Sequence, residues 1–301
     1  QQLINGLVIG SVYALIALGY TMVYGILGLI NFAHGEVLMV GALTALQTML
    51  FLMGVAPGLS PLAMLSIALL VAIPVCMTLG FLMERLAYRR LRNAPRLAPL
   101  ITAIGMSFLL QTLAMIIWGR NYHTFPQLIS TTPLQPIPGV FITPVQVVIV
   151  LSSAAIMIGL WLLVNRTTAE NHRVASLMGV DTNAVIAFTF VVGAALAAIA
   201  GVMFASNYGI AHYGMGFMPG LKAFTAAVLG GIGNLAGAML GGIMLGLVES
   251  FGAGYIEHLT FGFLNSSYQD IFAFIILGLV LIFKPTGLLG ERGAGLGRSG
   301  E

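Results

Sequence analysis

Charged side chains are scarce in this sequence. Asp, Glu, Lys and Arg make up only 7% of its 301 residues, whereas ordinary soluble domains contain about 25%. Hydrophobic residues make up 59%, and the mean hydropathy is +1.02. A water-soluble fold of this composition would have no polar coat, so we predict a membrane protein that crosses the bilayer several times.

Cysteine and the familiar catalytic motifs are also absent or nearly so. Cys76 is the only cysteine, so no disulfide and no thiol metal site can form within the chain. The sequence contains no Gly-x-x-x-x-Gly-Lys-Ser/Thr phosphate loop, no paired His–Glu zinc motif and no Ser/His/Asp arrangement. We therefore predict a protein that is not an enzyme, with no catalytic residues, no metal and no ATP hydrolysis of its own.

Long apolar runs follow one another along almost the whole chain. They cover about 3–24, 37–54, 62–83, 97–118, 145–164, 184–206, 223–251 and 271–283. All but the last are long enough, or nearly so, to cross a bilayer as a helix, at about 20 residues per crossing. Their hydrophobicity is continuous rather than alternating, which favours helices over a β-barrel. We predict one all-α transmembrane domain over 1–301 with about eight membrane segments. Because the chain opens at Gln1 without a methionine, we expect a few further residues upstream.

Positive charge predicts how these segments are oriented. Ten of the twelve Lys and Arg residues lie in three gaps, namely Arg85, Arg89, Arg90, Arg92 and Arg96, then Arg166 and Arg173, then Lys284, Arg292 and Arg298. The positive-inside rule places all three gaps in the cytoplasm. The proline-rich segment at about 119–143 then forms an ordered outer loop. Because the basic residues adjoin apolar runs, we assign no nucleic-acid role and expect the first gap to contact lipid head groups.

This orientation requires the run at 223–251 to start and finish on the outer side of the membrane. Its 29 residues are too few for two full crossings of a core about 30 Å thick, at about 1.5 Å per residue. A broken or re-entrant hairpin fits, because the glycines in Gly230-Gly231-Ile232-Gly233-Asn234 free the backbone to reverse. The alternative is a kinked, tilted helix with a different number of crossings.

A second interruption separates the first two apolar runs, at 24–36. Broken helices in transporters place polar groups and free backbone near the pathway. We therefore take as candidate translocation-pathway residues Asn31, His34, Glu36, Gly230, Gly231, Gly233 and Asn234. The alternative for the first break is a capped surface loop, with Asn31 or Gly35 near the cap and Glu36 in the first helical turn. His34 and Glu36 have no third ligand nearby, which argues against a metal site.

The second break is flanked by two charges. Glu249 lies within an apolar run and needs a partner there, so we expect it to pair with Lys222 or with a partner subunit. Small residues follow the break in two overlapping small-xxx-small registers, formed by Gly237, Gly241, Gly242 and Gly246. These registers predict close packing between helices.

A polar segment at about 165–183 lies on the predicted cytoplasmic side. Ala175 and Met178 are three residues apart and therefore share one face of a short helix, which Gly179 would end. A surface helix of this kind either lies on lipid or docks a partner protein. The pattern itself leaves both open.

Three runs of this sequence resemble signatures of the branched-chain (hydrophobic) amino acid ABC importer permeases, and most closely those of the LivH type. The first resembles the N-terminal signature and reads LGYTMVYGILGLINFAHGE, at 18–36. The other two read KAFTAAVLGGIGN, at 222–234, and KPTGLLG, at 284–290. They follow one another in the family order, and the resemblance covers nearly the whole chain.

The resemblance implies one of two transmembrane subunits, in a heterodimer, of an importer in a bacterial inner membrane. Two cytoplasmic ATPases would bind ATP and Mg and drive alternating access, and a periplasmic binding protein would deliver the solute. The resemblance also implies that the polar segment docks an ATPase through Glu170, Arg173, Ala175, Leu177, Met178 and Gly179. It places a Gly-Arg-x-x-Arg-Ala stretch before that segment. Here Arg166-Thr167-Thr168 leads directly into it, so either the loop is shorter or residues are missing before Ala169.

Three other functions remain open from the sequence. Members of the same family architecture handle urea or short amides. An ion-coupled secondary amino acid transporter would use Glu36 or Glu249 as its proton or sodium site. A membrane scaffold that transports nothing would need neither an ATPase nor a second permease.

Overall fold

The protein is a bundle of long α-helices with a few short strands at one end. The computed structural model describes residues 1–91, 94–95, 97–167, 181–263 and 268–290. The longer helices are α1 (Gln2–Leu27), α2 (His34–Val55), α3 (Pro61–Met83), α5 (Leu97–Trp118), α6 (Pro144–Thr167), α8 (Thr182–Tyr208) and α10 (Leu235–Leu259). The shorter ones are η1 (Glu84–Tyr88, a π-helical turn), α4 (Arg89–Leu91), α9 (Phe217–Gly230) and α11 (Asp270–Phe283). Within the described ranges, seven helices are long and apolar enough to cross a membrane.

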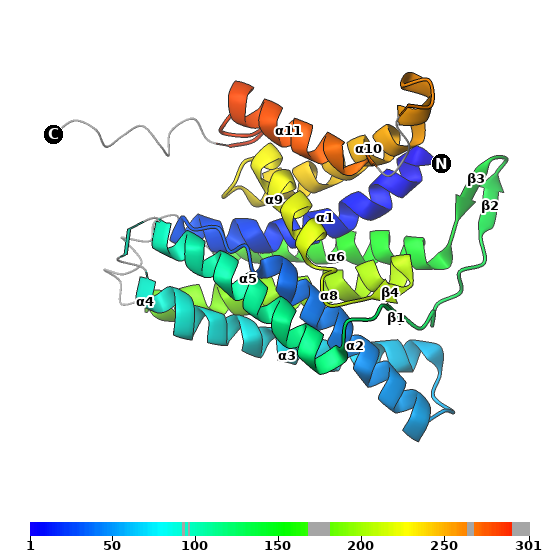
Figure 1. Ribbon diagram of the computed structural model, residues 1–301, viewed down its shortest axis with the longest axis horizontal. Coiled ribbons are helices and arrows are strands. Elements are labelled where there is room, and N and C mark those ends of the chain that lie inside the picture. Colours follow the sequence, from blue (N-terminus) through cyan, green and yellow to red (C-terminus); the bar gives the residue numbers. More distant parts are fainter. Residues whose placement is uncertain (92–93, 96, 168–180, 264–267, 291–301) are drawn as a thin grey trace.

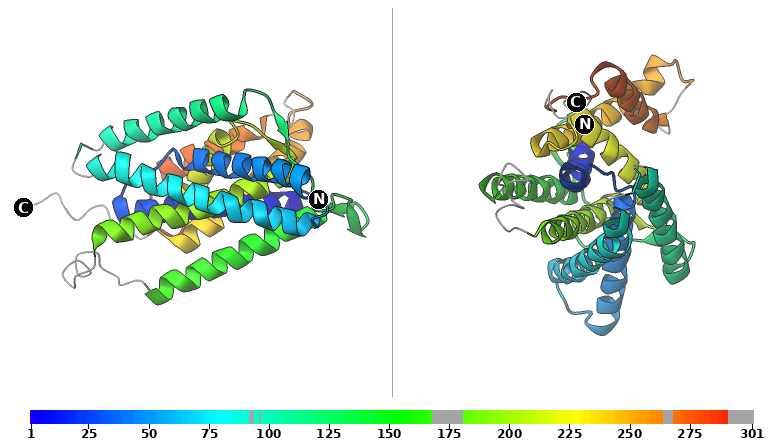
Figure 2. Two further views of the ribbon diagram at one scale, coloured as in Figure 1. Left: turned by 90° about the horizontal axis from the view of Figure 1, so that it is seen from below. Right: turned by 90° about the vertical axis from the view of Figure 1, so that its left-hand side faces the viewer.

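The bundle has two distinct ends (Figures 1 and 2). The chain begins at the end that carries the hairpin of β2 (Leu134–Ile137) and β3 (Val140–Ile142), and the Gln1 side chain donates a hydrogen bond to the Phe141 carbonyl there. The opposite end holds α4 and the last turns of α6 and α11, the three places where the basic gaps begin. We name this end the cytoplasmic end and the strand-bearing end the outer end, after the orientation that the positive-inside rule predicts.

The predicted outer loop contains three of the short strands. β1 (His123–Thr124) pairs with β4 (Ile210–Ala211), which lies between α8 and α9, and β2 pairs with β3. The β1–β4 pair ties the loop after α5 to the segment that leads into α9. Its strands are too short for the hydropathy pattern to reveal.

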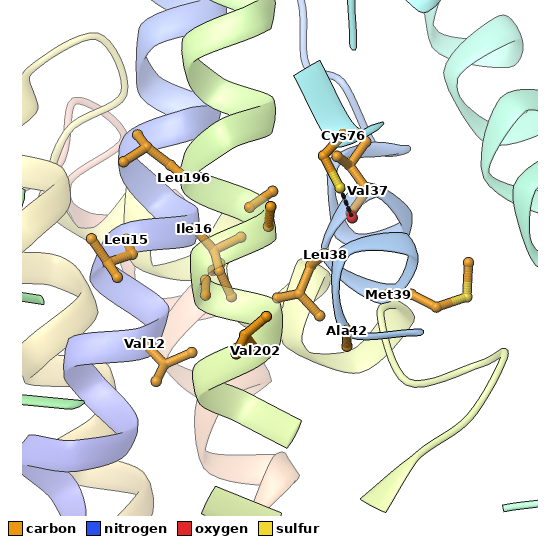
Figure 3. Packing of buried hydrophobic residues seen from close by; sticks show 14 of the residues in the cluster. Val12, Leu15, Ile16, Val37, Leu38, Met39, Ala42, Cys76, Leu196 and Val202 are labelled. Carbon is orange, nitrogen blue, oxygen red and sulfur yellow. Dashed lines mark hydrogen bonds between the residues drawn. The ribbon is translucent and has the colours of Figure 1, made fainter. Parts of the chain in front are cut away.

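The core is built where α1, α2 and α8 meet (Figure 3). Leu15 and Ile16 of α1 and Leu38 of α2 are completely buried among their neighbours. Cys76 of α3 is buried beside them, and its thiol donates a weak hydrogen bond to the Val37 carbonyl at 3.4 Å. The lone cysteine is thus a small core residue.

Glycines bring α10 into backbone contact with two other helices. A Cβ on Gly10 would lie 2.8 Å from the Ile243 Cα, so α1 and α10 touch along a seam that Gly242 and Gly246 complete. A Cβ on Gly241 would lie 2.8 Å from the Gly230 backbone nitrogen, which belongs to α9. The two small-residue registers predicted from sequence therefore face two different helices, and the predicted close packing is confirmed.

The predicted hairpin is present, but its bounds differ from those expected. It consists of α9 (Phe217–Gly230) and α10 (Leu235–Leu259) rather than the run at 223–251, and the break between them lies at the cytoplasmic end. The first turns of α9 contain Pro219 and Gly220, and the last turn of α10 contains Glu257 and His258, which the apolar count left out. Because α10 has 25 residues, it is long enough for a full crossing, and the 14-residue α9 is about two-thirds as long as one.

Candidate translocation site

The first break folds back into the bundle. Gly28 ends α1 in a left-handed conformation with φ of +64°, which glycine adopts without strain. The chain then returns, and α2 starts beside the middle of α1, since the His34 ring lies against Gly19. A side chain at position 19 would collide with that ring. The second helix therefore begins inside the protein rather than at its surface.

Asn31 is held in place by hydrogen bonds. Its Oδ1 accepts from the Tyr88 hydroxyl at 2.8 Å and from the Ala33 backbone N–H at 3.2 Å, and the residue is 4% exposed. The Tyr88 contact ties the first break to the π-helical turn at the end of α3. Ala33 rather than Asn31 or Gly35 occupies the N-cap position, and no side chain caps α2.

His34 and Glu36 lie in the first turn of α2 and are both buried. The His34 ring packs against the Tyr20 ring with a centroid distance of 4.9 Å, and its Nε2 has no hydrogen-bond partner among the described atoms. Glu36 Oε1 accepts from Ser107 Oγ at 3.0 Å and from Gln111 Nε2 at 2.7 Å, both on α5. Its Oε2 has no partner in the described parts of the chain. Glu36 is thus surrounded by neutral groups and only half satisfied.

The second break is built by glycines and by the C-terminal segment. Gly231 and Gly233 have φ values of 108° and 96°, and a Cβ on Gly231 would lie 2.6 Å from the Gly290 nitrogen. Asn234 caps α10, since its Oδ1 accepts from the Gly237 N–H at 2.9 Å, and its Nδ2 donates to the Leu289 carbonyl at 2.9 Å. The signatures at 222–234 and 284–290 therefore form one local structure.

The two breaks meet at the cytoplasmic end. A cavity of about 820 Å³ there is lined by Tyr24 and Ile30 from the first break and by Ile232, Gly233 and Asn234 from the second. A neighbouring cavity of about 670 Å³ is lined by Ile26 to Ile30 of the same break. Both volumes fall within the range of about 300–1,000 Å³ typical of ligand sites.

The other pathway candidates are placed differently. Gly230 ends α9 and Gly231 follows it, and both are buried without lining the cavity, whereas Asn31, His34 and Glu36 lie in the packed core. The structure therefore brings Gly233 and Asn234 to a shared cavity with the first break, and it separates the polar residues of that break from this cavity. Their part in a pathway stays a prediction.

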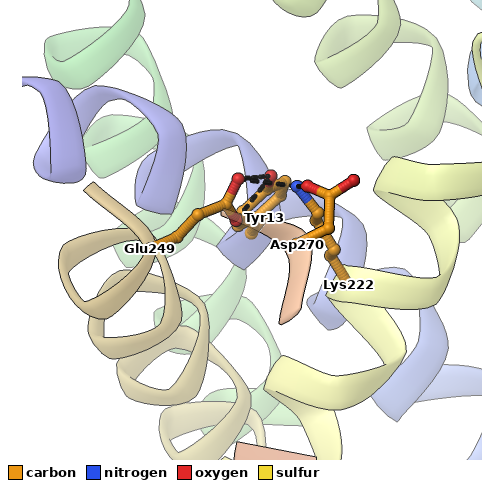
Figure 4. Close-up of polar contacts among 4 residues, drawn as sticks. All are labelled: Tyr13, Lys222, Glu249 and Asp270. Carbon is orange, nitrogen blue, oxygen red and sulfur yellow. Dashed lines mark hydrogen bonds and ion pairs between the residues drawn. The ribbon is translucent and has the colours of Figure 1, made fainter. Parts of the chain in front are cut away.

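An ion network joins four helices, with Lys222 and Glu249 buried and Asp270 partly exposed (Figure 4). Lys222 Nζ on α9 lies 2.6 Å from Glu249 Oε1 on α10 and 2.6 Å from Asp270 Oδ1 on α11. The Tyr13 hydroxyl on α1 donates to Glu249 Oε2 at 3.1 Å. The predicted pairing of Glu249 with Lys222 is confirmed. Asp270 and Tyr13 were not predicted. The sequence offered a signal for Asp270, because this acid directly precedes the last apolar run.

The predicted ATPase-coupling residues all lie outside the described residues. They are Glu170, Arg173, Ala175, Leu177, Met178 and Gly179, within 168–180. Their role remains a prediction from sequence. Among the described residues, no group of three or more His, Cys, Asp or Glu side chains is arranged to hold a metal ion.

Comparison with known proteins gives full-length matches. Residues 2–281 match the family model described as "Branched-chain amino acid transport system / permease component". The high-affinity branched-chain amino acid transport system permease protein BraD of Pseudomonas aeruginosa is 46% identical over 97% of this chain and 95% of its own length. The corresponding LivH of Escherichia coli is 42% identical over the same shares. A probable branched-chain amino acid transport permease, LivH of Methanocaldococcus jannaschii, is 27% identical over 96% of this chain and 92% of its own. No solved structure matches the chain.

Proposed function

The chain belongs to the family of permease components of branched-chain amino acid transport systems, and we propose that it imports branched-chain amino acids as the multi-pass permease subunit of a bacterial inner-membrane ABC importer. The full-length similarity to BraD and LivH favours this function over permeases for urea or short amides and over ion-coupled secondary transport. It also favours transport over a passive scaffold.

Two helix breaks that line one cavity are the observation that carries this function. The breaks bring Ile30 and Gly233 to the same space at the cytoplasmic end. Backbone groups freed by a broken helix can replace water around a charged solute, as they do in other transporters. The cavity is mainly apolar, which suits an aliphatic side chain. The cytoplasmic end of the path therefore has the chemistry that an apolar amino acid requires.

The chain itself does no hydrolysis in this proposal. Two partner ATPases bind ATP and Mg, a second permease subunit completes the path as a heterodimer, and a periplasmic binding protein delivers the amino acid. Docking of the ATPase through the segment at 165–183 transmits its closure to α6 and α8, which flank that segment in sequence. Alternating access would follow from movement of these helices against the glycine-broken ones.

Reconstitution tests the function directly. The permease, its companion subunit and two ATPases are co-purified, placed in vesicles with the binding protein, and assayed for uptake of radiolabelled leucine. We expect uptake that requires ATP and is unaffected by collapse of the proton and sodium gradients. Uptake that needs a gradient but no ATPase would instead establish a secondary transporter. Competition by urea but not by valine would establish the other substrate class.

Two asparagine variants test the breaks. Asn31→Ala and Asn234→Ala are compared with Tyr88→Phe, which removes the same hydrogen bond to Asn31 while leaving its amide in place. If Asn31 belongs to the pathway, Asn31→Ala lowers leucine uptake and Tyr88→Phe does so much less. Equal losses would mean that Asn31 only anchors the loop. Wild-type uptake in both asparagine variants would remove the two breaks from the pathway.

A further inference from the structure

A third cavity lies toward the outer end and shares no lining residue with the two cytoplasmic cavities. We call it the outer pocket, and it has a volume of about 360 Å³. It is formed by α5, by the loop that follows α5, and by the segment between β4 and α9. The residues on which its chemistry depends are Phe108, Gln111, Arg120, Tyr122, His212 and Phe217. The β1–β4 pair holds the two loops together beneath these side chains.

One side of the outer pocket presents a hydrogen-bond acceptor, Gln111 Oε1, with the buried carboxylate of Glu36 behind it. Gln111 Nε2 donates to Glu36 Oε1 at 2.7 Å, which turns the Gln111 Oε1 away from Glu36 and leaves it as an acceptor. Glu36 is 1% exposed, and its Oε2 has no partner within the described residues. A carboxylate with one unpaired oxygen in an apolar interior carries a high desolvation cost. Such a residue is therefore a candidate for a functional role. This side of the pocket is suited to a cation.

The other polar side presents a cation. Arg120 lies two residues after the end of α5, is exposed, and forms no ion pair with any residue that the structure describes. Burial lowers the pKa of His212, which favours the neutral form of its ring. His212 Nδ1 accepts from the Gly214 N–H at 3.2 Å, and the ring packs 4.4 Å from that of Tyr122. Arg120 is therefore the fixed positive charge of the pocket, and guanidinium binds carboxylate well.

The remaining surface is aromatic. Phe108, Tyr122 and Phe217 line the pocket, and Phe108 and Phe217 offer only apolar atoms. Such walls suit an aliphatic side chain, and the volume lies in the range of about 300–1,000 Å³ seen for small-molecule sites. A ligand for this pocket would carry a cation, an anion and an apolar group. A free aliphatic α-amino acid has all three.

We propose that the outer pocket binds an aliphatic amino acid as a zwitterion before it crosses, with Arg120 on its carboxylate and Gln111, backed by Glu36, on its ammonium group. This rests on the proposed importer function and adds the residues that recognise the solute at the outer end. The proposal places Glu36 behind Gln111 at an outer binding site rather than at the cytoplasmic cavity. Gln111 and Arg120 lie outside every motif that the sequence singles out.

Analogues that lack one charge test the assignment. Leucine uptake by the reconstituted assembly is competed with 3-methylbutylamine, which lacks the carboxylate, and with 4-methylpentanoate, which lacks the ammonium group. The wild type should prefer leucine over both. Arg120→Gln should raise the KM for leucine by about tenfold or more and reduce its preference over 3-methylbutylamine. Glu36→Gln and Gln111→Leu should reduce the preference over 4-methylpentanoate instead. Arg120→Lys should recover part of the affinity, because it keeps the charge but not the forked geometry.

Controls separate this assignment from folding and from the proposed function. Gln135→Leu removes an exposed amide from β2, outside the pocket, and should leave the KM and both preferences unchanged. Each variant is compared with the wild type for its thermal unfolding midpoint in detergent. If the pocket variants keep wild-type KM values, or lose affinity for leucine without any change in preference between the analogues, the outer pocket does not bind the zwitterion. Failure of the wild type to import leucine with ATP would overturn the importer function itself.

Discussion

Glu36 and Glu249 lie in two regions that bury a carboxylate equally, since each residue is 1% exposed, but the two regions treat it differently. Glu249 has a cation, Lys222, on one oxygen and the Tyr13 hydroxyl on the other. Glu36 has only neutral donors on one oxygen and nothing on the other within the described residues. Loss of a partner should therefore destabilise the fold around Glu249, whereas Glu36 is placed to act on a ligand through Gln111, as we propose.

The packing of the helices around the two acids differs as well. Glu249 lies on α10 one turn from Gly246, where the glycine seam brings α1 and α10 into contact and fixes the distance to Tyr13. Glu36 lies under Gln111, which forms a wall of the outer pocket. The partners of Glu249 enclose it in an ion network, whereas the partner of Glu36, Gln111, lines the outer pocket.

The largest loss of stability should follow from removal of the cation in the paired region. Lys222→Met leaves Glu249 and Asp270 facing each other without compensation, and breaking a buried ion pair costs about 3–5 kcal/mol. The unfolding midpoint in detergent, followed by fluorescence, should fall sharply. Lys284→Met is the matched control, because Lys284 is exposed and, within the described residues, its ammonium group donates only to the Leu288 carbonyl. Equal midpoints for the two variants would mean that the network contributes little.

A smaller loss should follow from disruption of the glycine seam. Gly246→Ala places a methyl group against the Gly10 backbone, and overpacking of this kind costs about 1–3 kcal/mol. Gly159→Ala in α6 is the control, because a Cβ there meets no atom within 4 Å. Alanine in place of glycine inside a helix should stabilise by about 0.5–1 kcal/mol. Thermal unfolding of the two variants should therefore shift in opposite directions, and a shared direction would contradict the seam.

The next loss should be that of one hydrogen bond in the paired region. Tyr13→Phe removes the hydroxyl that donates to Glu249 while Lys222 remains, so the free energy of unfolding should fall by about 1 kcal/mol. In a Lys222→Met background the same change should cost more, because Tyr13 is then the remaining donor to that carboxylate. Unfolding of the single and double variants measures this coupling. Additive losses would show that the two partners act independently.

The sequence predicted the paired region well because its signals are local. The apolar runs predicted the long helices, and the spacing of Gly242 and Gly246 predicted close helix packing. One acid and one base on either side of the same break predicted the pair of Glu249 and Lys222. Tyr13 lies 236 residues from Glu249 in the chain. The contact between Tyr13 and Glu249 could not be predicted, because hydropathy locates a helix but does not specify which helices pack beside it.

The region around Glu36 was predicted only in part. The cost of a buried acid singled out Glu36, but its donors lie on α5, 71 and 75 residues further along. The outer pocket depends on a pair of two-residue strands that bring Tyr122 and His212 together. Strands of that length have no recognisable pattern. The short helix α9 was also mispredicted at its start, since glycine and proline there do not form an apolar run.

The smallest effect on stability should come from Glu36→Gln, which directly contrasts the two regions. The glutamine keeps the shape and the acceptor for Ser107 and Gln111, and it removes an uncompensated buried charge, so the free energy of unfolding should change by about 0.5 kcal/mol or less. Leucine uptake should nevertheless fall by about tenfold or more, equivalent to about 1.4 kcal/mol of binding. Glu249→Gln should do the opposite, since it leaves Lys222 with Asp270 alone and lowers stability by about 1–3 kcal/mol, while uptake per folded protein is retained. Unfolding and uptake measured on the same preparations distinguish a role in binding from a role in stability. If Glu36→Gln unfolds as readily as Glu249→Gln and both import leucine normally, the two acids have the same structural role.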